Sequence, residues 1–245
     1  MPYEGCILGY FTVWQGPENN VCDSLNIQKR NEVLIGWSKD GFHWNRENKK
    51  PFLPVSEDFH AWNAGNVQST AGSPLIVGDS LYLYVSGRYN SKPKHDSNFA
   101  TGLAMLRRDG FVSMRAGRKE GYVEIKTQIP ANGNYLFVNA DVKGTLAVEV
   151  LDDNGQPMEG FTKKDCISMK KSDKTKQMIS WEKHPGVTSL VGKTVRLKFY
   201  LNQADIYAFW ISAWQTGESG GYTGGGGPGL SDKGIDTPMD KLKNN

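Results

Sequence analysis

The sequence predicts an all-β protein in which about two blades of a β-propeller are followed by an antiparallel β-sandwich. An apolar run at residues 33–44 contains an Asp40-Gly41 turn, and the same pattern returns at residues 103–114 around Asp109-Gly110. From residue 121 onward, short alternating strands are separated by polar turns, which is typical of a sandwich. No segment shows the apolar period of a helix of three turns.

The two Asp-Gly turns are the basis for expecting propeller blades. An Asp-Gly pair supplies the positive-φ residue that a hairpin turn needs. Asp40 and Asp109 lie roughly 70 positions apart, a spacing that is typical of large propeller blades. We therefore interpret both aspartates as turn-forming residues and residues 1–117 as about two blades.

The first domain has six apolar segments that predict strands. They are residues 4–14, 32–37, 73–77, 81–86, 101–106 and 111–114. Gly78-Asp79 is a hairpin turn between two of them. Residues 15–30 and 87–99 are polar and are expected to be loops, and residues 62–69 are rich in amides with little apolar alternation.

The second domain, residues 118–214, is expected to be the sandwich. Its strands are expected at residues 122–129, 135–142, 145–151, 177–181, 194–201 and 206–214. The turn at residues 152–155 reads Asp-Asp-Asn-Gly and predicts a hairpin. After Gln215 the chain is dominated by glycine. Burial cannot offset the entropy of ordering such a segment, so residues 215–245 are expected to be disordered.

Composition excludes several classes of function. The net charge is +3 and the charges are interspersed, which argues against a nucleic-acid partner. No apolar run approaches the roughly 18 residues of a membrane helix, so no membrane partner is expected. Three cysteines show no metal-like spacing, and no cofactor motif is present. The start does not read as a signal peptide, so an extracytoplasmic location would require a signal in a preceding part.

Glu4 is the candidate catalytic residue. It stands at the head of an apolar strand, where partial desolvation would raise the carboxyl pKa and suit a general acid. The residues alone favour the alternative, a solvent-exposed carboxylate at a frayed terminus.

The amides of Asn63, Asn66 and Gln68 are candidates for substrate binding. They alternate with smaller residues, and amides can hydrogen-bond sugar hydroxyls without adding charge. The alternative interpretation is a hydrogen-bonded loop with no ligand.

Three further side chains are candidate substrate contacts. Arg88 follows a strand and could bind a carboxylate, or it is an ordinary strand-end cation. His60 stands beside Trp62, and both could contact a ligand. The chain has seven Trp and ten Tyr, an excess that suits stacking on sugar rings but equally suits large β-sheets. His43, between two aromatics, is interpreted as structural.

Motifs along residues 2–214 resemble a group of bacterial proteins related to glycoside hydrolase families 32 and 43. The matching segments are PYEG (2–5), RNEV (30–33), SKDGFHW (38–44), WNAGNVQ (62–68), YVSGR (84–88), TGLA (101–104), RRDGF (107–111) and YLFVNA (135–140). The resemblance implies a five-bladed propeller, which family 32 follows with a β-sandwich.

The resemblance also implies a carbohydrate as partner and hydrolysis of glycosidic bonds by paired carboxylates. Glu4 is the position that would be the acid. The first-blade Asp of the family has no counterpart here, so the chain is expected to be an N-terminally truncated fragment with little activity alone. The absent propeller half would then be a second partner. The alternative is a carbohydrate-binding or purely structural module without catalysis, and no metal or cofactor is expected.

Overall fold

The computed structural model describes residues 1–26, 29–58, 60–90, 97–221 and 234–238. It confirms an all-β protein, with 53% of the residues in strands and 5% in helices. Within these ranges no helix has the length and apolar character needed to cross a membrane. The chain divides into two compact units, whose main parts are Met1–Leu106 and Arg107–Gly220.

The first unit begins with an antiparallel meander. Its strands are β1 (Pro2–Tyr3), β2 (Cys6–Trp14), β3 (Asn31–Ser38) and β4 (Trp44–Asn45). Each strand pairs with the next. The turn before β4 forms as predicted, because Gly41 adopts a φ of +81° that a side chain would disfavour.

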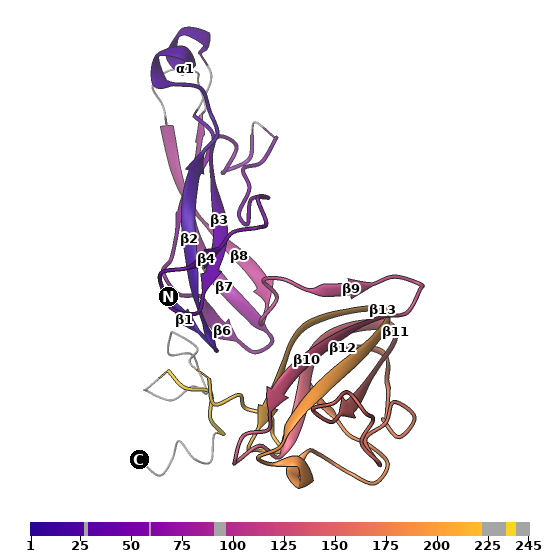
Figure 1. The fold of residues 1–245 in the computed structure, drawn as a ribbon. Helices are drawn as coiled ribbons and strands as arrows, with labels where there is room; N and C mark the ends of the chain where they lie inside the picture. The colour runs from indigo at the N-terminus through magenta and orange to yellow at the C-terminus, as the bar shows by residue number, and fades with distance from the viewer. Residues whose placement is uncertain (27–28, 59, 91–96, 222–233, 239–245) are drawn as a thin grey trace. The chain divides into compact units, whose positions relative to one another are not determined.

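A second meander completes the sheet of the first unit (Figure 1). Its strands are β5 (Asn66–Thr70), β6 (Leu75–Val77), β7 (Ser80–Asn90) and β8 (Ser97–Arg107). β5 and β6 pair with successive parts of β7, and β8 also pairs with β7. A single parallel pair, Asn31 with Asn66, joins this meander to the first.

The core of the first unit lies where the two meanders meet. Val33 on β3, Val67 on β5 and Val85 on β7 are each at most 3% exposed and pack together. Leu83 and Val55 complete this cluster. Along β7, the alternation that buries Leu81, Leu83 and Val85 sets which face of the strand is buried.

A short helix, α1 (Asn19–Leu25), lies within the predicted loop at residues 15–30. The expectation of a loop throughout that segment is wrong, because Cys22 buries its side chain and anchors one turn. Asn26 ends the helix in the left-handed conformation, with a φ of +54°, which asparagine tolerates better than most residues.

The second unit contains one curled five-stranded sheet. Its strands are β9 (Met114–Ala116), β10 (Gly121–Gln128), β11 (Tyr135–Leu151), β12 (Met169–Ile179) and β13 (Thr194–Ser212), with a 3₁₀ turn, η1 (Thr188–Leu190). The order is β10-β13-β11-β12, and β9 also pairs with β13. Among the described residues, all strands of this unit belong to that one sheet, so two facing sheets are not confirmed.

Two predicted strand pairs are continuous strands in the structure. The segments expected at 135–142 and 145–151 form the single strand β11, and those expected at 194–201 and 206–214 form β13. The pairing register shifts between Val142 and Thr145. A bulge of this kind bends a strand without ending it, which lets 17 and 19 residues curl around one core.

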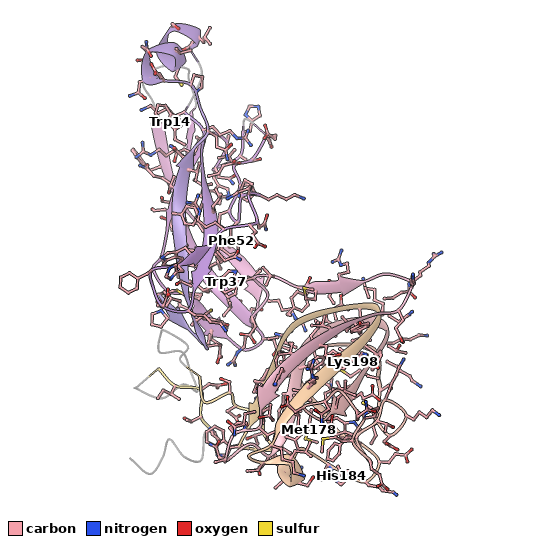
Figure 2. The ribbon with its side chains drawn as sticks, viewed as in Figure 1. Trp14, Trp37, Phe52, Met178, His184 and Lys198 are labelled. Atoms are coloured by element: carbon pink, nitrogen blue, oxygen red, sulfur yellow. The ribbon has the colours of Figure 1, made fainter. Side chains whose placement is uncertain are left out.

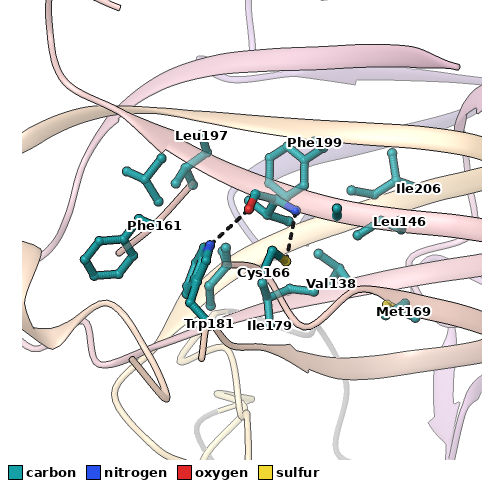
Figure 3. Close-up of a cluster of buried hydrophobic side chains, with 14 of the residues drawn as sticks. Val138, Leu146, Phe161, Cys166, Met169, Ile179, Trp181, Leu197, Phe199 and Ile206 are labelled. Carbon is teal, nitrogen blue, oxygen red and sulfur yellow. Dashed lines mark hydrogen bonds between the residues drawn. The ribbon is translucent and has the colours of Figure 1, made fainter. Parts of the chain in front are cut away.

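The buried face of this sheet forms the largest apolar cluster of the described chain (Figure 3). Trp181 lies inside it at 1% exposure, and its indole N–H donates to the carbonyl of Val148 at 3.0 Å. Phe161 meets the same indole edge-on, with ring centroids 5.1 Å apart. The Cys166 sulfur accepts from the Val148 amide at 3.2 Å. Burial raises the pKa of the Cys166 thiol, so this cysteine has a structural role.

The second Asp-Gly turn does not make the predicted hairpin. Asp109 takes a φ of +57°, and the following strand, β9, pairs with β13 instead of returning along β8. The buried amide of Asn139 holds this turn: its Nδ2 donates to the Arg108 carbonyl at 2.6 Å, and its Oδ1 accepts from Arg107 Nε at 2.6 Å. The expectation of a repeated strand-turn-strand unit is therefore wrong for the second copy.

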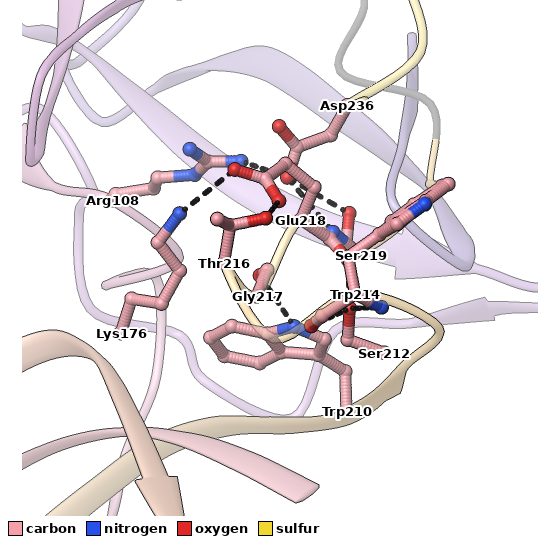
Figure 4. Close-up of polar contacts among 10 residues, drawn as sticks. All are labelled: Arg108, Lys176, Trp210, Ser212, Trp214, Thr216, Gly217, Glu218, Ser219 and Asp236. Carbon is pink, nitrogen blue, oxygen red and sulfur yellow. Dashed lines mark hydrogen bonds and ion pairs between the residues drawn. The ribbon is translucent and has the colours of Figure 1, made fainter. Parts of the chain in front are cut away.

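Part of the segment expected to be disordered has defined partners (Figure 4). Trp210 Nε1 donates to the Gly217 carbonyl at 3.0 Å, and Ser212 Oγ donates to the Glu218 carbonyl at 2.7 Å. Asp236 is 8% exposed and forms an ion pair with Arg108 at 2.9 Å. The described parts of the predicted tail are thus packed, and its residues 222–233 and 239–245 lie outside the described residues.

Candidate functional site

Glu4 and Gln68 belong to different ends of the first unit's sheet. Glu4 occupies the turn between β1 and β2, with a φ of +48°. Gln68 lies beside the other end of β2, because its carbonyl accepts a hydrogen bond from the Thr12 hydroxyl. Eight residues of extended chain span roughly 25 Å. The predicted acid therefore does not join the predicted binding amides.

Two of the predicted binding residues, Gln68 and Arg88, do line one cleft. Its volume is about 190 Å³. Its lining comes from β5, β7 and β8 and consists of Gln68, Ser86, Gly87, Arg88, Phe99, Ala100 and Thr101. The Arg88 guanidinium lies 4.6 Å from the centroid of the Phe99 ring, so the cleft combines an aromatic face with a cation, an amide and hydroxyls.

A β-bulge positions Gln68. Val67 pairs with Gly87 and Ser69 pairs with Ser86, so Gln68 is the extra residue that has no partner on β7. A bulge redirects a side chain relative to the regular alternation. Ser69 Oγ and Ser86 Oγ lie 2.8 Å apart directly after it, which fixes the strand pair on that side of the bulge.

Asn66 lies beside this cleft and carries a buried acceptor that is not satisfied. It is the cross-strand partner of Arg88 and is 7% exposed. Within the described chain its Oδ1 has no hydrogen-bond partner. Leaving such a group unpaired costs about 1–3 kcal/mol, so a donor from a ligand or a bound water would stabilise it.

Trp62 lies on the opposite face of the sheet from Arg88. A Cβ at Gly87 or at Gly102 would come 2.4 Å from its indole carbons, so the ring covers both glycines. Successive strand residues point to opposite faces, which separates Trp62 from the Arg88 side chain. Trp62 is 37% exposed but does not line the cleft.

Asn63 and His60 belong to the segment that precedes β5, and they do not line the cleft either. The Asn63 amide donates to the Pro54 carbonyl at 3.2 Å, and the backbone N–H of His60 donates to Asp58 Oδ1 at 2.9 Å. The alternative interpretation of Asn63, a hydrogen-bonded loop residue, agrees with this contact.

Glu32 is a buried carboxylate that was not among the predicted site residues. It is 3% exposed, and its Oε1 accepts from Arg30 Nη2 at 3.0 Å and from the Val55 amide at 3.3 Å. Arg30 also pairs with Glu57 at 2.8 Å. The sequence signal was a lone acid inside the apolar run of β3, two positions after an arginine. These contacts give Glu32 a structural role.

A second cleft, not predicted from the sequence, lies at the end of the sheet near Glu4. Its volume is about 340 Å³, and its lining consists of Trp37, Lys39, Asp40, His43, Trp44 and Asn45. Figure 2 shows Trp37 and Trp14 toward opposite ends of the β2–β3 pair. In the sequence, this cleft could have been found from the several aromatic residues around the first Asp-Gly turn.

The Asp40 carboxylate organises the turn beside this second cleft. Its Oδ1 accepts from the amides of Phe42 and His43 at 2.9 and 2.8 Å, and its Oδ2 lies 2.6 Å from His43 Nδ1. The hydrogen bond from the His43 ring, followed by those from the backbone amides, holds the pKa of Asp40 well below its usual range. Asp40 is therefore an ionised, turn-forming carboxylate that accepts hydrogen bonds on both oxygens.

Neither cleft is a metal site in the structure described. Among the described residues, no group of three or more His, Cys, Asp or Glu side chains is placed to hold a metal ion. Comparison of the chain with protein-family models, with curated proteins and with solved structures gave no match. The function therefore has to be argued from the chemistry of the clefts themselves.

Proposed function

We propose that the first unit binds a carbohydrate in the cleft of Gln68, Arg88 and Phe99, and that this chain alone does not hydrolyse it. The observation that carries the proposal is the joining of an amide, a guanidinium, hydroxyls and an aromatic face within one cleft of about 190 Å³. Small-ligand sites combine apolar surface with a few convergent polar groups in this way.

Each group in the cleft suits one part of a sugar ring. The Gln68 amide both donates and accepts, and the Arg88 guanidinium supplies several donors in a planar fork. The Phe99 ring offers an apolar surface to the C–H face of a pyranose. Stacking on Phe99 holds the Arg88 guanidinium in place, so less side-chain entropy is lost when the ligand binds.

The expectation of no hydrolysis by this chain is supported by the placement of Glu4 and Glu32. A glycosidase needs two carboxyl groups within about 5–10 Å of each other across the scissile bond. Glu4 lies roughly 25 Å along β2 from the cleft, and Glu32 is held by Arg30 and the Val55 amide.

The proposal includes the interpretation of the two meanders as propeller blades related to glycoside hydrolases of families 32 and 43. Its support is that each meander is antiparallel within itself and that one bridge, Asn31 to Asn66, links them.

Isothermal titration with a panel of neutral and acidic oligosaccharides tests the binding. For the best ligand we expect Arg88→Ala and Gln68→Ala to weaken affinity about tenfold or more, since each removes hydrogen bonds to the sugar. Arg46→Ala is the matched control, because Arg46 also stacks on a phenylalanine, 4.5 Å from Phe11, outside the cleft. Equal loss in the control, or no binding by any member of the panel, would refute the proposal.

Aryl glycosides test the second half of the proposal. We expect no turnover above background by the purified chain. Turnover that Glu4→Gln abolishes would overturn the conclusion that this chain does not hydrolyse its ligand, while leaving the binding result in place.

A further inference from the structure

The cleft of Trp37 and Trp44 has the composition of a second ligand site. Trp37 and Trp44 are 42% and 40% exposed, and both residues border a cleft of about 340 Å³. Trp37 pairs with Asn45 and Trp44 pairs with Ser38, so the Trp37 and Asn45 side chains share one face of the strand pair and Trp44 lies on the other. Small-molecule sites are lined mainly by aromatic and apolar side chains with a few polar groups. This cleft is larger than the cleft of Gln68 and Arg88.

The walls of this cleft are held rigidly. The Trp44 ring lies against the backbone of Gly9, where a Cβ would come 2.7 Å from Cζ3. Its indole N–H donates to the Gly41 carbonyl at 3.0 Å. The buried Ser38 hydroxyl accepts from the Gly41 amide at 2.9 Å. A preformed wall lowers the entropy that a ligand must overcome on binding.

The polar edge of the cleft contains one lysine, Lys39, and one acid, Asp40. Lys39 lines it and has no ion-pair partner among the described residues. His43 also lines it, and its side chain is 92% exposed. The one acid in the lining, Asp40, already accepts hydrogen bonds on both oxygens from its own turn. Asp40 keeps its own negative charge, and Lys39 is the cation of the lining that a ligand carboxylate can pair with.

We propose that the Trp37–Trp44 cleft binds an acidic sugar residue, such as a uronate, as a second carbohydrate site of the first unit. This inference rests on the proposed carbohydrate binding and adds a location and a ligand class to it. The Trp37 ring stacks on the pyranose, the Asn45 amide contacts its hydroxyls, and the Lys39 ammonium pairs with its carboxylate.

Titration with oligogalacturonate and with the same oligosaccharide as its methyl ester tests the charge requirement. We expect the wild-type chain to bind the acid about tenfold more tightly than the ester, and to lose that preference in Lys39→Met, which keeps the aliphatic stem. Binding is followed both by titration calorimetry and by quenching of tryptophan fluorescence.

The indole contribution is tested with Trp37→Ala against Trp14→Ala. Trp14 is a matched control, since it is 47% exposed with Lys29 5.5 Å from its ring and lies at the other end of β2. We expect Trp37→Ala to remove most of the quenching and to lower affinity for the acid about tenfold, and Trp14→Ala to leave both unchanged. A thermal melt of each variant shows whether the fold is retained.

Three results would overturn the inference. They are equal affinity for acid and ester, unchanged binding in Lys39→Met and Trp37→Ala, or loss of oligogalacturonate binding only in Arg88→Ala. The last result would leave the proposed function intact and assign the ligand to the other cleft. A chain that binds neutral sugars alone would likewise support only the proposed function.

Discussion

The indole of Trp62 lies directly on the backbone of Gly87, and a Cβ at that glycine would come 2.4 Å from its Cζ3. Gly102 on β8 lies under the same ring, where an added Cβ would come 2.4 Å from Cη2. Two glycines on adjacent strands thus form a flat surface for one tryptophan. We expect Gly87→Ala to displace the ring and lower the free energy of unfolding by about 1–3 kcal/mol, as measured by urea denaturation.

Gly72→Ala is the control for this effect. No atom lies within 4 Å of a Cβ built at Gly72, so we expect its stability to stay within about 0.5 kcal/mol of the wild type. If both variants lost the same stability, the loss would come from backbone effects of the alanines and not from the contact with Trp62.

Tyr10→Phe is expected to stabilise the first unit. The Tyr10 ring stacks on Phe52 with centroids 5.7 Å apart, but its hydroxyl is buried and has no hydrogen-bond partner in the described chain. Burial raises the pKa of Tyr10. Removing the hydroxyl removes its desolvation cost and keeps the stack, so we expect a gain of about 1 kcal/mol in urea denaturation.

Tyr84→Phe provides the comparison, because Tyr84 is 51% exposed and its hydroxyl remains hydrated. We expect no change in stability for this variant. A destabilised Tyr10→Phe would show that the hydroxyl has a partner in solution, such as an ordered water.

The sequence predicted several local features of the fold correctly, although not the helix α1 or the ends of β7 and β8 inside the loop expected at residues 87–99. The hairpin between β3 and β4 follows from its Asp-Gly turn, and the strands β2, β7 and β10 follow from their apolar content. These features depend on neighbouring residues only, through turn chemistry and the two-residue period of a strand.

Features that depend on distant residues were not predictable in the same way. The pairing of β9 with β13 joins segments about 90 positions apart, and no local signal specifies it. The amide-rich β5 did not look like a strand, because its pairing with β7 and its bulge at Gln68 override a weak propensity. The bulges that join the halves of β11 and β13 have no reliable sequence signature.

The candidate site was predicted in part, for a similar reason. Gln68 and Arg88 do share a cleft, since their strands are neighbours in the chain and pair directly. The sequence placed Glu4 and Trp62 in the same site as Gln68 and Arg88. Sequence motifs do not show how far apart two side chains lie, or on which face of a sheet. A strand of nine residues separates Glu4 from Gln68, and one step along β7 puts Gly87 and Arg88 on opposite faces.

Asp141→Asn is expected to stabilise the second unit. Asp141 is the cross-strand partner of both Asp205 and Asp173, so three carboxylates form a row across β13, β11 and β12. Arg115 pairs with Asp205 at 2.8 Å, and Arg107 pairs with Asp173. Asp141 has no such partner among the described residues. Like charges directly opposite are unfavourable by about 0.2–1 kcal/mol, and we expect a gain of that size in thermal denaturation.

Salt and a neighbouring variant check the cause of that gain. The gain should shrink in about 1 M salt, where the Debye length is about 3 Å. Asp173→Asn removes the partner of Arg107 and is expected to give no gain. A gain of equal size in both variants would contradict the assignment of the repulsion to Asp141.

The stability of the second unit should depend on Tyr200 at alkaline pH. Desolvation by burial, with the hydrogen bond that its hydroxyl donates to Glu149 Oε2 at 2.7 Å, raises the pKa of Tyr200 to about 12 from a normal value of 10.0. Between these two values the unfolded chain loses the Tyr200 proton while the folded chain keeps it. Unfolding is therefore favoured progressively as the pH rises through this window, and stability falls.

Tyr200→Phe should remove this part of the alkaline decline. The variant has no hydroxyl to ionise, so its unfolding free energy should fall less steeply than that of the wild type between pH 10 and 12, as measured by urea denaturation across that range. Tyr122→Phe is the control, since the ring centroids of Tyr122 and Tyr200 lie 6.4 Å apart and Tyr122 is 63% exposed. If Tyr122→Phe flattened the decline as much as Tyr200→Phe, the slope would arise from the surface as a whole. If the unfolding free energy fell less steeply with pH only in Tyr200→Phe, the slope would be assigned to the Tyr200–Glu149 hydrogen bond and to the burial of Tyr200.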